Sequence, residues 1–259
     1  MRVTTDQLAG TRPDGFEQRL AGLRRLAIVP ALNEETSIAG VVAEIRAADP
    51  EFEVIVVDDG SHDRTAEVAA AAGAHVVSHP YNLGIGGAVQ TGLQYARDQD
   101  FQVAVQVDGD AQHDPSEIPK LLAPILEDRA DLVVGSRFLG DGDYRPPVSR
   151  LLGIRLLARI VSLIVGQRVT DTTSGFRAAN RRAIDLFAAD YPHDYPEVEA
   201  TVLVVRHRLR MVEVPVRMRL RTTGSSSITF RSSAYYMYKV LLALFIGLFR
   251  RFPTPLEEQ

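Results

Sequence analysis

The chain has 259 residues, 46% hydrophobic and 24% charged, which suits one large α/β domain, alone or with a small appendage. It contains no cysteine, which excludes disulfide bonds, thiolate metal sites and a cysteine nucleophile and fits a reducing compartment. The net charge of −4 is unevenly spread, because residues 1–143 hold 11 Lys/Arg against 24 Asp/Glu and residues 144–251 hold 18 against 7.

This uneven charge suggests two different tasks for the two halves. The acidic half could hold a metal ion, and the basic half could meet phosphates or an anionic membrane face. A chance sorting of charges is the alternative. Residues 1–24 are polar and carry no apolar signal core, so we expect a lead-in segment with one helix near 16–23.

Short apolar runs alternate with helix-like segments through the first half of the chain. The expected strands are 26–29, 54–57, 75–78, 103–107 and 132–134, and the expected helices between them are 38–48, 65–72, 88–97 and 115–127. This alternation predicts an α/β fold with a mainly parallel, doubly wound sheet. Such sheets bind ligands beyond the carboxyl ends of their strands.

The second half follows a different pattern. We expect an apolar, arginine-bearing helix at 150–165, a polar turn at 170–177, helices at 181–188 and 197–207, a strand at 211–217, a polar loop at 221–227 and an apolar helix at 235–249. The last apolar run is about 15 residues, whereas a spanning helix needs about 20. An interfacial or partner-docked helix is therefore favoured over a core helix or a membrane span.

Two carboxylates follow the fourth expected strand, in Asp108-Gly109-Asp110. In an extended chain Asp108, Asp110 and Gln112 point to one side, so together they could offer three oxygens to a hard cation such as Mg²⁺. A surface turn would give the same tripeptide, but polar clusters at 30–34, 58–61 and 136–137 end other strands at the same edge. His113 could assist the metal, although we expect it at the surface.

Several motifs occur in a recognisable order along the chain. They are PALNE at 30–34, VVDDGS at 56–61, NLGIGG at 82–87, DGDAQ at 108–112, GSR at 135–137, SGFR at 174–177, VEVPV at 212–216 and RTTGS at 221–225. The first five resemble the GT-A catalytic domain of inverting family 2 glycosyltransferases. The last three are similar to the dolichol- or polyprenyl-phosphate hexose (mannose) synthase branch. The resemblance covers about residues 24–230, and it implies a domain at 25–230 followed by the apolar helix and acidic tail of 231–259.

The resemblance implies a donor site for a UDP- or GDP-hexose. In that family Pro30, Leu32, Glu34 and either Asp58 or Asp59 would line the base and ribose, although relatives usually carry an aromatic residue where Leu32 stands. The two aspartates could instead cap the next helix. The metal would be Mg²⁺ or Mn²⁺, bound with the diphosphate; the list of implied ligands is Asp108, Asp110 and Gln112.

The basic half supplies the implied acceptor groups. The comparison favours Arg137 and Arg150 for an acceptor phosphate, and Arg221 with Ser225 for closing over the donor. Arg177 is a further substrate-binding candidate, because the arginine fork suits phosphate oxygens. For any of these arginines, a solvated or carboxylate-paired side chain is the alternative.

The nature of the acceptor decides whether a base is needed. A sugar hydroxyl must lose its proton, whereas a lipid monophosphate is already ionised near neutral pH. The carboxylates expected near the acceptor are Asp171, Asp194, Glu197 and Glu199, of which Asp171 is expected to hold the 172–175 turn. We take Asp110, Arg137 and Glu199 as the catalytic candidates. The weak base signal favours a phosphate acceptor.

The expected function is transfer of a hexose from a nucleotide-diphosphate sugar to a polyprenyl phosphate. The enzyme would be cytoplasmic and peripheral on the inner face of the cell membrane, held there through 235–249. It would bind no nucleic acid, and a homodimer is possible. Transfer to a sugar hydroxyl, a nucleotidyltransferase and a non-catalytic nucleotide-sugar binder are the alternatives.

Overall fold

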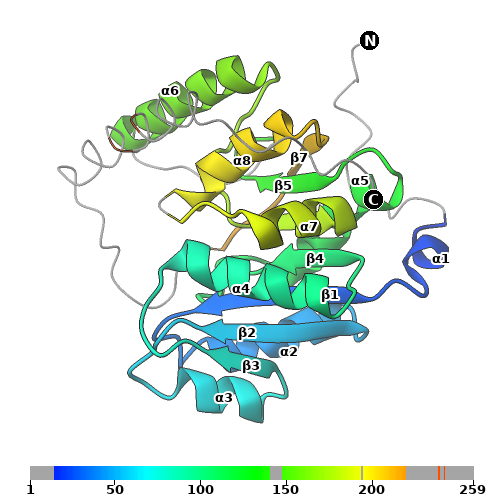
Figure 1. Ribbon diagram of the computed structural model, residues 1–259, viewed down its shortest axis with the longest axis vertical. Coiled ribbons are helices and arrows are strands. Elements are labelled where there is room, and N and C mark those ends of the chain that lie inside the picture. Colours follow the sequence, from blue (N-terminus) through cyan, green and yellow to red (C-terminus); the bar gives the residue numbers. More distant parts are fainter. Residues whose placement is uncertain (1–14, 141–147, 194, 220–238, 240–241, 243–259) are drawn as a thin grey trace.

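The computed structural model describes residues 15–140, 148–193 and 195–219, together with Lys239 and Leu242. Its centre is a seven-stranded sheet in the order β3-β2-β1-β4-β6-β5-β7 (Figure 1). The strands are β1 Arg25–Ala31, β2 Phe52–Asp58, β3 His75–Ser78, β4 Val103–Gln106, β5 Leu132–Ser136, β6 Arg177–Asn180 and β7 Met211–Pro215. All neighbouring strands run parallel except β6, which is antiparallel to both β4 and β5. The predicted mainly parallel, doubly wound sheet is confirmed.

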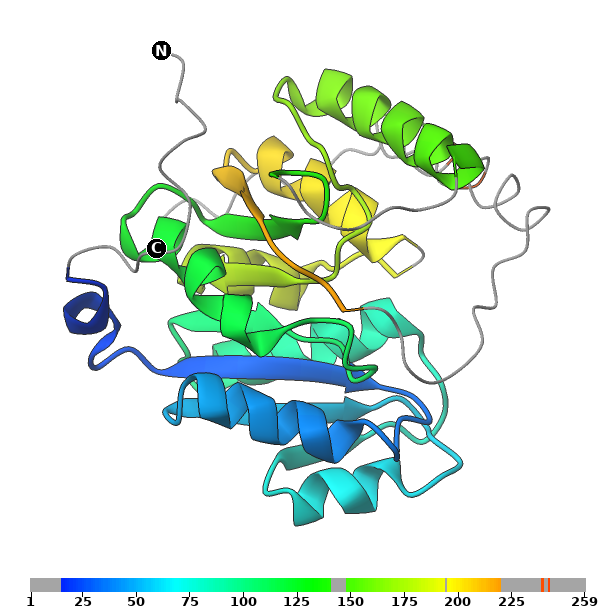
Figure 2. The same cartoon turned by 180° about the vertical axis from the view of Figure 1, so that it is seen from behind.

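Helices cover both faces of this sheet. They are α1 Phe16–Leu20, α2 Ile38–Ala48, α3 Thr65–Ala71, α4 Ile85–Asp98, the 3-10 helix η2 Pro115–Glu117, α5 Ile118–Leu126, α6 Val148–Val165, α7 Arg181–Ala189 and α8 Pro196–Arg206. Side chains alternate along β1, so Leu26 and Ile28 join the cluster under α4, α6, α7 and α8. Ala27 and Val29 join the cluster under α1, α2 and α5, which lie on the face seen in Figure 2.

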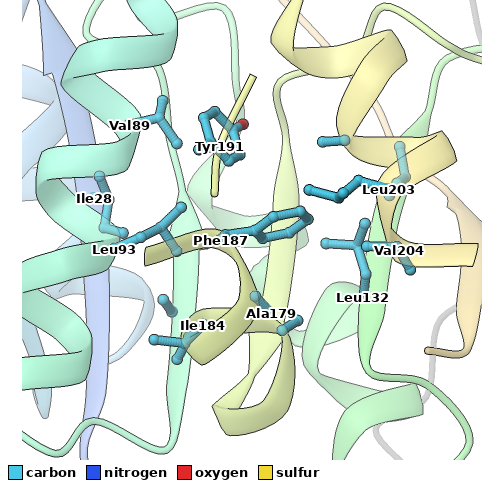
Figure 3. Packing of buried hydrophobic residues seen from close by; sticks show 14 of the residues in the cluster. Ile28, Val89, Leu93, Leu132, Ala179, Ile184, Phe187, Tyr191, Leu203 and Val204 are labelled. Atoms are coloured by element: carbon cyan, nitrogen blue, oxygen red, sulfur yellow. The ribbon is translucent and has the colours of Figure 1, made fainter. Parts of the chain in front are cut away.

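The core beneath α4, α7 and α8 is built from buried apolar side chains. Phe187 of α7 lies between Leu93 on α4 and Val204 on α8, with Leu132 of β5 below (Figure 3). All four side chains are buried. This packing holds α7 and α8, from the basic half of the chain, against α4 and β5, from the acidic half.

The strand β6 is absent from the sequence expectations, which place a polar turn at 170–177 and a helix directly after it. Its sequence, Arg-Ala-Ala-Asn, contains no β-branched or aromatic residue that would predict a strand. Pairing with β4 on one side and β5 on the other makes it a strand, with Ala178 and Ala179 buried. Because β6 is antiparallel, its first residue, Arg177, pairs with Gln106 and Val134 at the carboxyl end of the sheet.

The C-terminal expectations are not tested by this structure. The loop at 221–227 lies outside the described residues, as does the helix at 235–249 apart from Lys239 and Leu242. The domain limits at 24 and 230 stay predictions. Within the part of the chain that is described, no helix has both the length and the apolar character needed to cross a membrane.

Candidate functional site

A cavity of about 250 Å³ opens at the carboxyl ends of β1, β2 and β4. This is the edge of the sheet where the sequence places its polar clusters. The lining includes six residues predicted for the site: Pro30, Leu32, Glu34, Asp59, Asp108 and Asp110. Residues from three separate strand ends therefore line one cavity, which is large enough to hold part of a ligand.

One wall of the cavity is made by the segment that follows β1. Leu32 is 39% exposed, so an apolar surface is available there to a flat ligand group. The backbone N–H of Glu34 donates to Thr65 Oγ1 at 2.8 Å. The Ser37 hydroxyl lies 2.9 Å from Glu34 Oε2 and 2.7 Å from the carbonyl oxygen of Gly109. Ser37 thus connects this wall to the loop after β4.

Asp58 holds the turn that follows β2. Its Oδ1 accepts from the backbone N–H of Ser61 at 3.1 Å, and the side chain is buried. The Ser61 hydroxyl in turn accepts from the N–H of Asn33 at 2.9 Å. Asp58 is not among the cavity-lining residues. The structure therefore gives it a turn-forming contact and does not use it as the cap of α3.

Asp59 shapes the opposite wall. Its carboxylate accepts from the backbone N–H groups of Leu83 and Gly84 at 2.9 and 2.8 Å. His79 Nδ1 lies 2.8 Å from the same carboxylate, and His79 Nε2 lies 2.9 Å from Thr91 Oγ1. Asp59 is only 3% exposed. It therefore fixes the loop before α4 against the cavity.

The loop after β4 presents both predicted metal-binding carboxylates to the cavity. Gln106 Nε2 donates to Asp108 Oδ1 at 3.0 Å. Gln112 donates to Asp110 twice, from its backbone nitrogen at 3.1 Å and from Nε2 at 2.6 Å. Gln112, the predicted third metal ligand, here directs its amide nitrogen to Asp110 and so orients that carboxylate.

The donor set fits a metal that is shared with a substrate. Among the described residues there is no group of three or more His, Cys, Asp or Glu side chains that could hold an ion. Two carboxylates, Asp108 and Asp110, line one cavity, and the Asp108 side chain is 33% exposed. Mg²⁺ and similar hard cations typically take one or two carboxylates and complete their shell with water and substrate phosphates. These residues fit Mg²⁺ or Mn²⁺ completed by a diphosphate.

His113 is buried, so its expected surface position is wrong. The side chain is 5% exposed and stacks on Phe176, with 4.7 Å between ring centroids. Its Nδ1 accepts from the backbone N–H of Asp108 at 3.0 Å, and its Nε2 lies 3.6 Å from Asp108 Oδ2. A neutral ring then carries its proton on Nε2, facing the carboxylate. His113 supports the loop from beneath.

Gly175 packs tightly against the side chains of Gln106 and Asp108. A Cβ built on Gly175 would lie 2.8 Å from Gln106 Nε2 and 3.1 Å from Asp108 Oδ2. Gly175 precedes β6 by two residues, in the SGFR motif. The strand β6, which the sequence expectations lack, brings this turn against the Asp108 carboxylate. The role of Gly175 could therefore not be assigned from the sequence.

We expect Gly175→Ala to lower kcat/KM by at least about tenfold without unfolding the protein, because an added methyl displaces Asp108 from its working position. Steady-state kinetics and a thermal melt would measure the two effects. Gly40→Ala is the matched control, since Gly40 is exposed on α2 with nothing within 4 Å of its added Cβ. Wild-type kinetics in Gly175→Ala would show that this close approach is not needed.

Arg137 is held by a buried carboxylate. Its Nε donates to Asp171 Oδ2 at 2.7 Å, and its Nη2 donates to Asp171 Oδ1 at 2.7 Å. Nη2 also donates to Thr173 Oγ1 at 2.7 Å. Arg137 is 12% exposed and Asp171 is fully buried. Asp171 also accepts from the backbone of Thr173 at 3.2 Å, as expected for the residue that holds this turn. The guanidinium fork predicted for a phosphate is thus already paired.

Glu213 extends this network from β7. Its carboxylate accepts from the backbone N–H and hydroxyl of Thr170 at 2.8 Å and from the N–H of Asp171 at 2.9 Å. Burial raises the pKa of Glu213 above its ordinary value, although these hydrogen bonds work against the shift. The sequence feature that could have pointed to Glu213 is its position as the one carboxylate within the apolar run of β7.

Arg177 lies inside the protein at the same edge of the sheet. Its Nε donates to the carbonyl oxygen of Ser174 at 2.8 Å, and one Nη donates to that of Glu197 at 2.5 Å. Among the described residues the other nitrogen, Nη1, is buried without a hydrogen-bond partner. A buried donor of this kind is costly unless a ligand or water completes it.

Glu197 faces this site from the first turn of α8. Burial raises the pKa of the Glu197 carboxyl, Asp108 adds to the rise, and Arg177 and Arg137 oppose it. The contact between the Glu197 carbonyl oxygen and Arg177 places the first turn of α8 beside the 174–177 turn. Glu199, the predicted catalytic carboxylate, lies in the same first turn of α8 and is partly buried.

Four residues predicted for the site cannot be placed. Asp194, Arg221 and Ser225 lie outside the described residues. Arg150 belongs to the first turn of α6, but the position of its side chain is not described. The structure therefore brings the donor-side candidates together and leaves part of the acceptor side open.

The chain is similar to known glycosyltransferases over most of its length. Residues 26–187 match glycosyl transferase family 2. The undecaprenyl-phosphate mannosyltransferase of Micrococcus luteus is 33% identical over 216 residues, 80% of this chain and 88% of that protein. The UDP-N-acetylglucosamine–dolichyl-phosphate N-acetylglucosaminyltransferase of Methanococcus voltae is 31% identical over 210 residues, 73% of this chain and 83% of that protein.

A solved structure shares the fold. Glucosyl-3-phosphoglycerate synthase from Mycobacterium tuberculosis, crystallised with Mn²⁺, UDP and glucosyl-3-phosphoglycerate, matches with a TM-score of 0.70 and 25% identity. The match covers 92% of this chain and 86% of that one. The expected GT-A fold is confirmed.

Proposed function

The chain belongs to glycosyl transferase family 2, and from this premise we propose that it transfers a hexose from a nucleotide-diphosphate sugar to a polyprenyl phosphate. The observation that carries the donor half is the pair Asp108 and Asp110 on one cavity at the sheet's carboxyl edge. The acceptor half rests on relatives whose names describe transfer to undecaprenyl phosphate and to dolichyl phosphate.

We propose that the cavity holds the nucleoside diphosphate. Pro30, Leu32 and Glu34 would contact the base and ribose, and Asp59 would keep the opposite wall in place. Asp108 and Asp110 would hold Mg²⁺ or Mn²⁺, which neutralises charge on the departing diphosphate. The proposal covers donors of both the UDP and the GDP type.

The reacting sugar would lie beside Asp108 and the 174–177 turn. Arg177 Nη1 is a buried donor that a substrate oxygen would satisfy. The backbone carbonyl of Glu197 accepts from Arg177, and we propose Glu197, together with the predicted Glu199, as a carboxylate on the substrate side of the site. An acceptor phosphate is already ionised, so an inverting attack on the anomeric carbon needs no deprotonating residue here.

The acceptor phosphate would bind on the basic side of the site. Arg150 stays a predicted ligand, with Arg221 and Ser225 closing over the donor. Arg137 is paired with Asp171 through its fork, so we propose that it supports the site with its charge and by holding the turn. The enzyme would act on the inner face of the cell membrane, where 235–249 would also bind.

A donor and acceptor screen tests the proposal. UDP- and GDP-hexoses would be offered with undecaprenyl phosphate, with 3-phosphoglycerate or with a free glycan, in Mn²⁺, Mg²⁺ or EDTA. We expect a hexosyl lipid phosphate and free nucleoside diphosphate with the lipid acceptor, and none in EDTA. Turnover with 3-phosphoglycerate or a glycan, and none with any lipid phosphate, would overturn the acceptor assignment. Release of pyrophosphate would indicate a nucleotidyltransferase.

A further inference from the structure

The helix α6 is attached to the rest of the protein by one face. Ile154, Leu157, Ala158 and Val161 recur at helical spacing and are buried. This face packs on α8, whose first turn carries Glu197. Figures 1 and 2 both show α6 at the outside of the molecule, with α8 beneath it.

A second apolar stripe runs along the outer face of α6. Leu156 is 50% exposed and Leu163 is 83% exposed, with the partly buried Ile160 between them. The spacing of these three residues puts them on one side of the helix. Leu163 is more exposed than any other large hydrophobic residue in the described part of the chain. Among the described residues, the outer apolar face of α6 is left without a covering element.

The charges beside this stripe are of one sign. Arg155 and Arg159 are exposed, Arg168 follows the helix, and residues 144–170 contain no Asp or Glu. Long arginine side chains can lie along an apolar surface and keep their heads in a polar layer. Apolar residues bordered by arginine are the pattern of a helix that rests in the headgroup layer of an anionic bilayer.

A second copy of the chain is a poorer occupant. In a symmetric dimer the same face meets itself, so two sets of arginines would approach with no acidic residue on either helix. The charge pattern favours a surface that supplies the missing negative charge.

We propose that the outer face of α6, formed by Leu156, Ile160 and Leu163 with Arg155 and Arg159, docks the protein on an anionic membrane surface. Because α6 packs on α8, docking there would bring the Glu197 side of the site toward the bilayer. The inference extends the proposed function, which places the acceptor in a membrane, but its observations come from α6 alone.

Vesicle binding by the full chain tests the proposal. The probes are phosphatidylcholine vesicles with and without phosphatidylglycerol. The variants are Leu156→Ser/Leu163→Ser and Arg155→Glu/Arg159→Glu, all at exposed positions. We expect each pair to weaken binding to the anionic vesicles at least about tenfold, since each loses apolar insertion or attraction to the surface.

Arg64→Glu, at the residue just before α3, is the charge control. Arg64 is exposed, and α3 lies at the opposite end of the molecule from α6 in Figure 1, so this change should leave vesicle binding within about twofold of wild type. Unchanged binding in both α6 variants would overturn the proposal. So would a concentration-dependent dimer, seen by sedimentation, that the α6 variants abolish.

Activity on a water-soluble, short-chain prenyl phosphate separates this inference from the proposed function. We expect the α6 variants to keep wild-type kcat/KM on that acceptor and to lose activity on vesicle-borne acceptor. If the wild type uses no lipid phosphate yet the variants lose vesicle binding, the acceptor assignment fails and docking through α6 stands. Circular dichroism and melting curves would confirm that the variants fold.

Discussion

We expect Asp110→Asn to lower kcat/KM by at least about 10²-fold and to raise the Mn²⁺ or Mg²⁺ concentration needed for half-maximal rate, because it would remove half of the proposed anionic metal site. The carboxylate lines the cavity and accepts two hydrogen bonds from Gln112. Gln112→Ala leaves the carboxylate charge but loses its orientation, so we expect a smaller loss of about tenfold in metal affinity. Rates measured across a metal titration would report both effects.

Asp98→Asn is the matched control for this pair. Asp98 is exposed at the end of α4 and pairs with Arg97 on the surface, so the same chemical change should leave the kinetics intact. If the Asp110 carboxylate served only the fold, Asp110→Asn would lower the stability of the protein and leave its metal affinity unchanged. Full activity of Asp110→Asn in EDTA would contradict a metal site at this loop.

Much of the fold was predictable because the acidic half obeys simple local rules. The runs at β2 and β4 are apolar and buried on both faces, and they are separated by helices of ordinary length. The strand β6 was not predictable, because Ala178 and Ala179 become strand residues through their two neighbours. Its antiparallel direction also decides which turn meets Asp108.

The site residues also divide into those that the sequence predicts and those that depend on β6. Asp108, Asp110 and Glu34 are polar residues at strand ends, and that pattern alone predicts a shared cavity. The supporting roles of His113 and Gly175 depend on contacts made by β6 and the turn before it. A histidine near acidic residues, or a glycine in a polar turn, has too many other uses for the sequence to single it out.

The basic half shows a different relation between sequence and structure. Its arginines were predicted to bind phosphate, but in the structure one of them, Arg137, forms an ion pair with Asp171. Asp171 and Thr170 are in turn fixed by Glu213. The turn that presents Gly175 to Asp108 is therefore anchored by buried charges from β5 and β7, so stability and catalysis are coupled at this position.

Asp171→Ala should lower the free energy of unfolding by about 3–5 kcal/mol, the usual cost of leaving a buried charge without its partner. Arg137 is 12% exposed and would keep its charge in a site that no longer compensates it. Two backbone N–H groups, those of Arg137 and Thr173, would also lose an acceptor. Urea denaturation of wild type and variant measures the loss.

Asp128→Ala supplies the comparison at the surface. Asp128 is 89% exposed and pairs with Arg210, so loss of this pair should cost less than about 1 kcal/mol, and alanine at the Asp128 φ of 52° should add about 1 kcal/mol of backbone strain. Adding Arg137→Met to Asp171→Ala removes the uncompensated charge and should recover part of the stability, but not the two unmet N–H groups. If Asp171→Ala costs no more than Asp128→Ala, the pair does not anchor the turn. If the double variant is no more stable than Asp171→Ala, the unmet backbone groups and not the buried charge are the source of the loss.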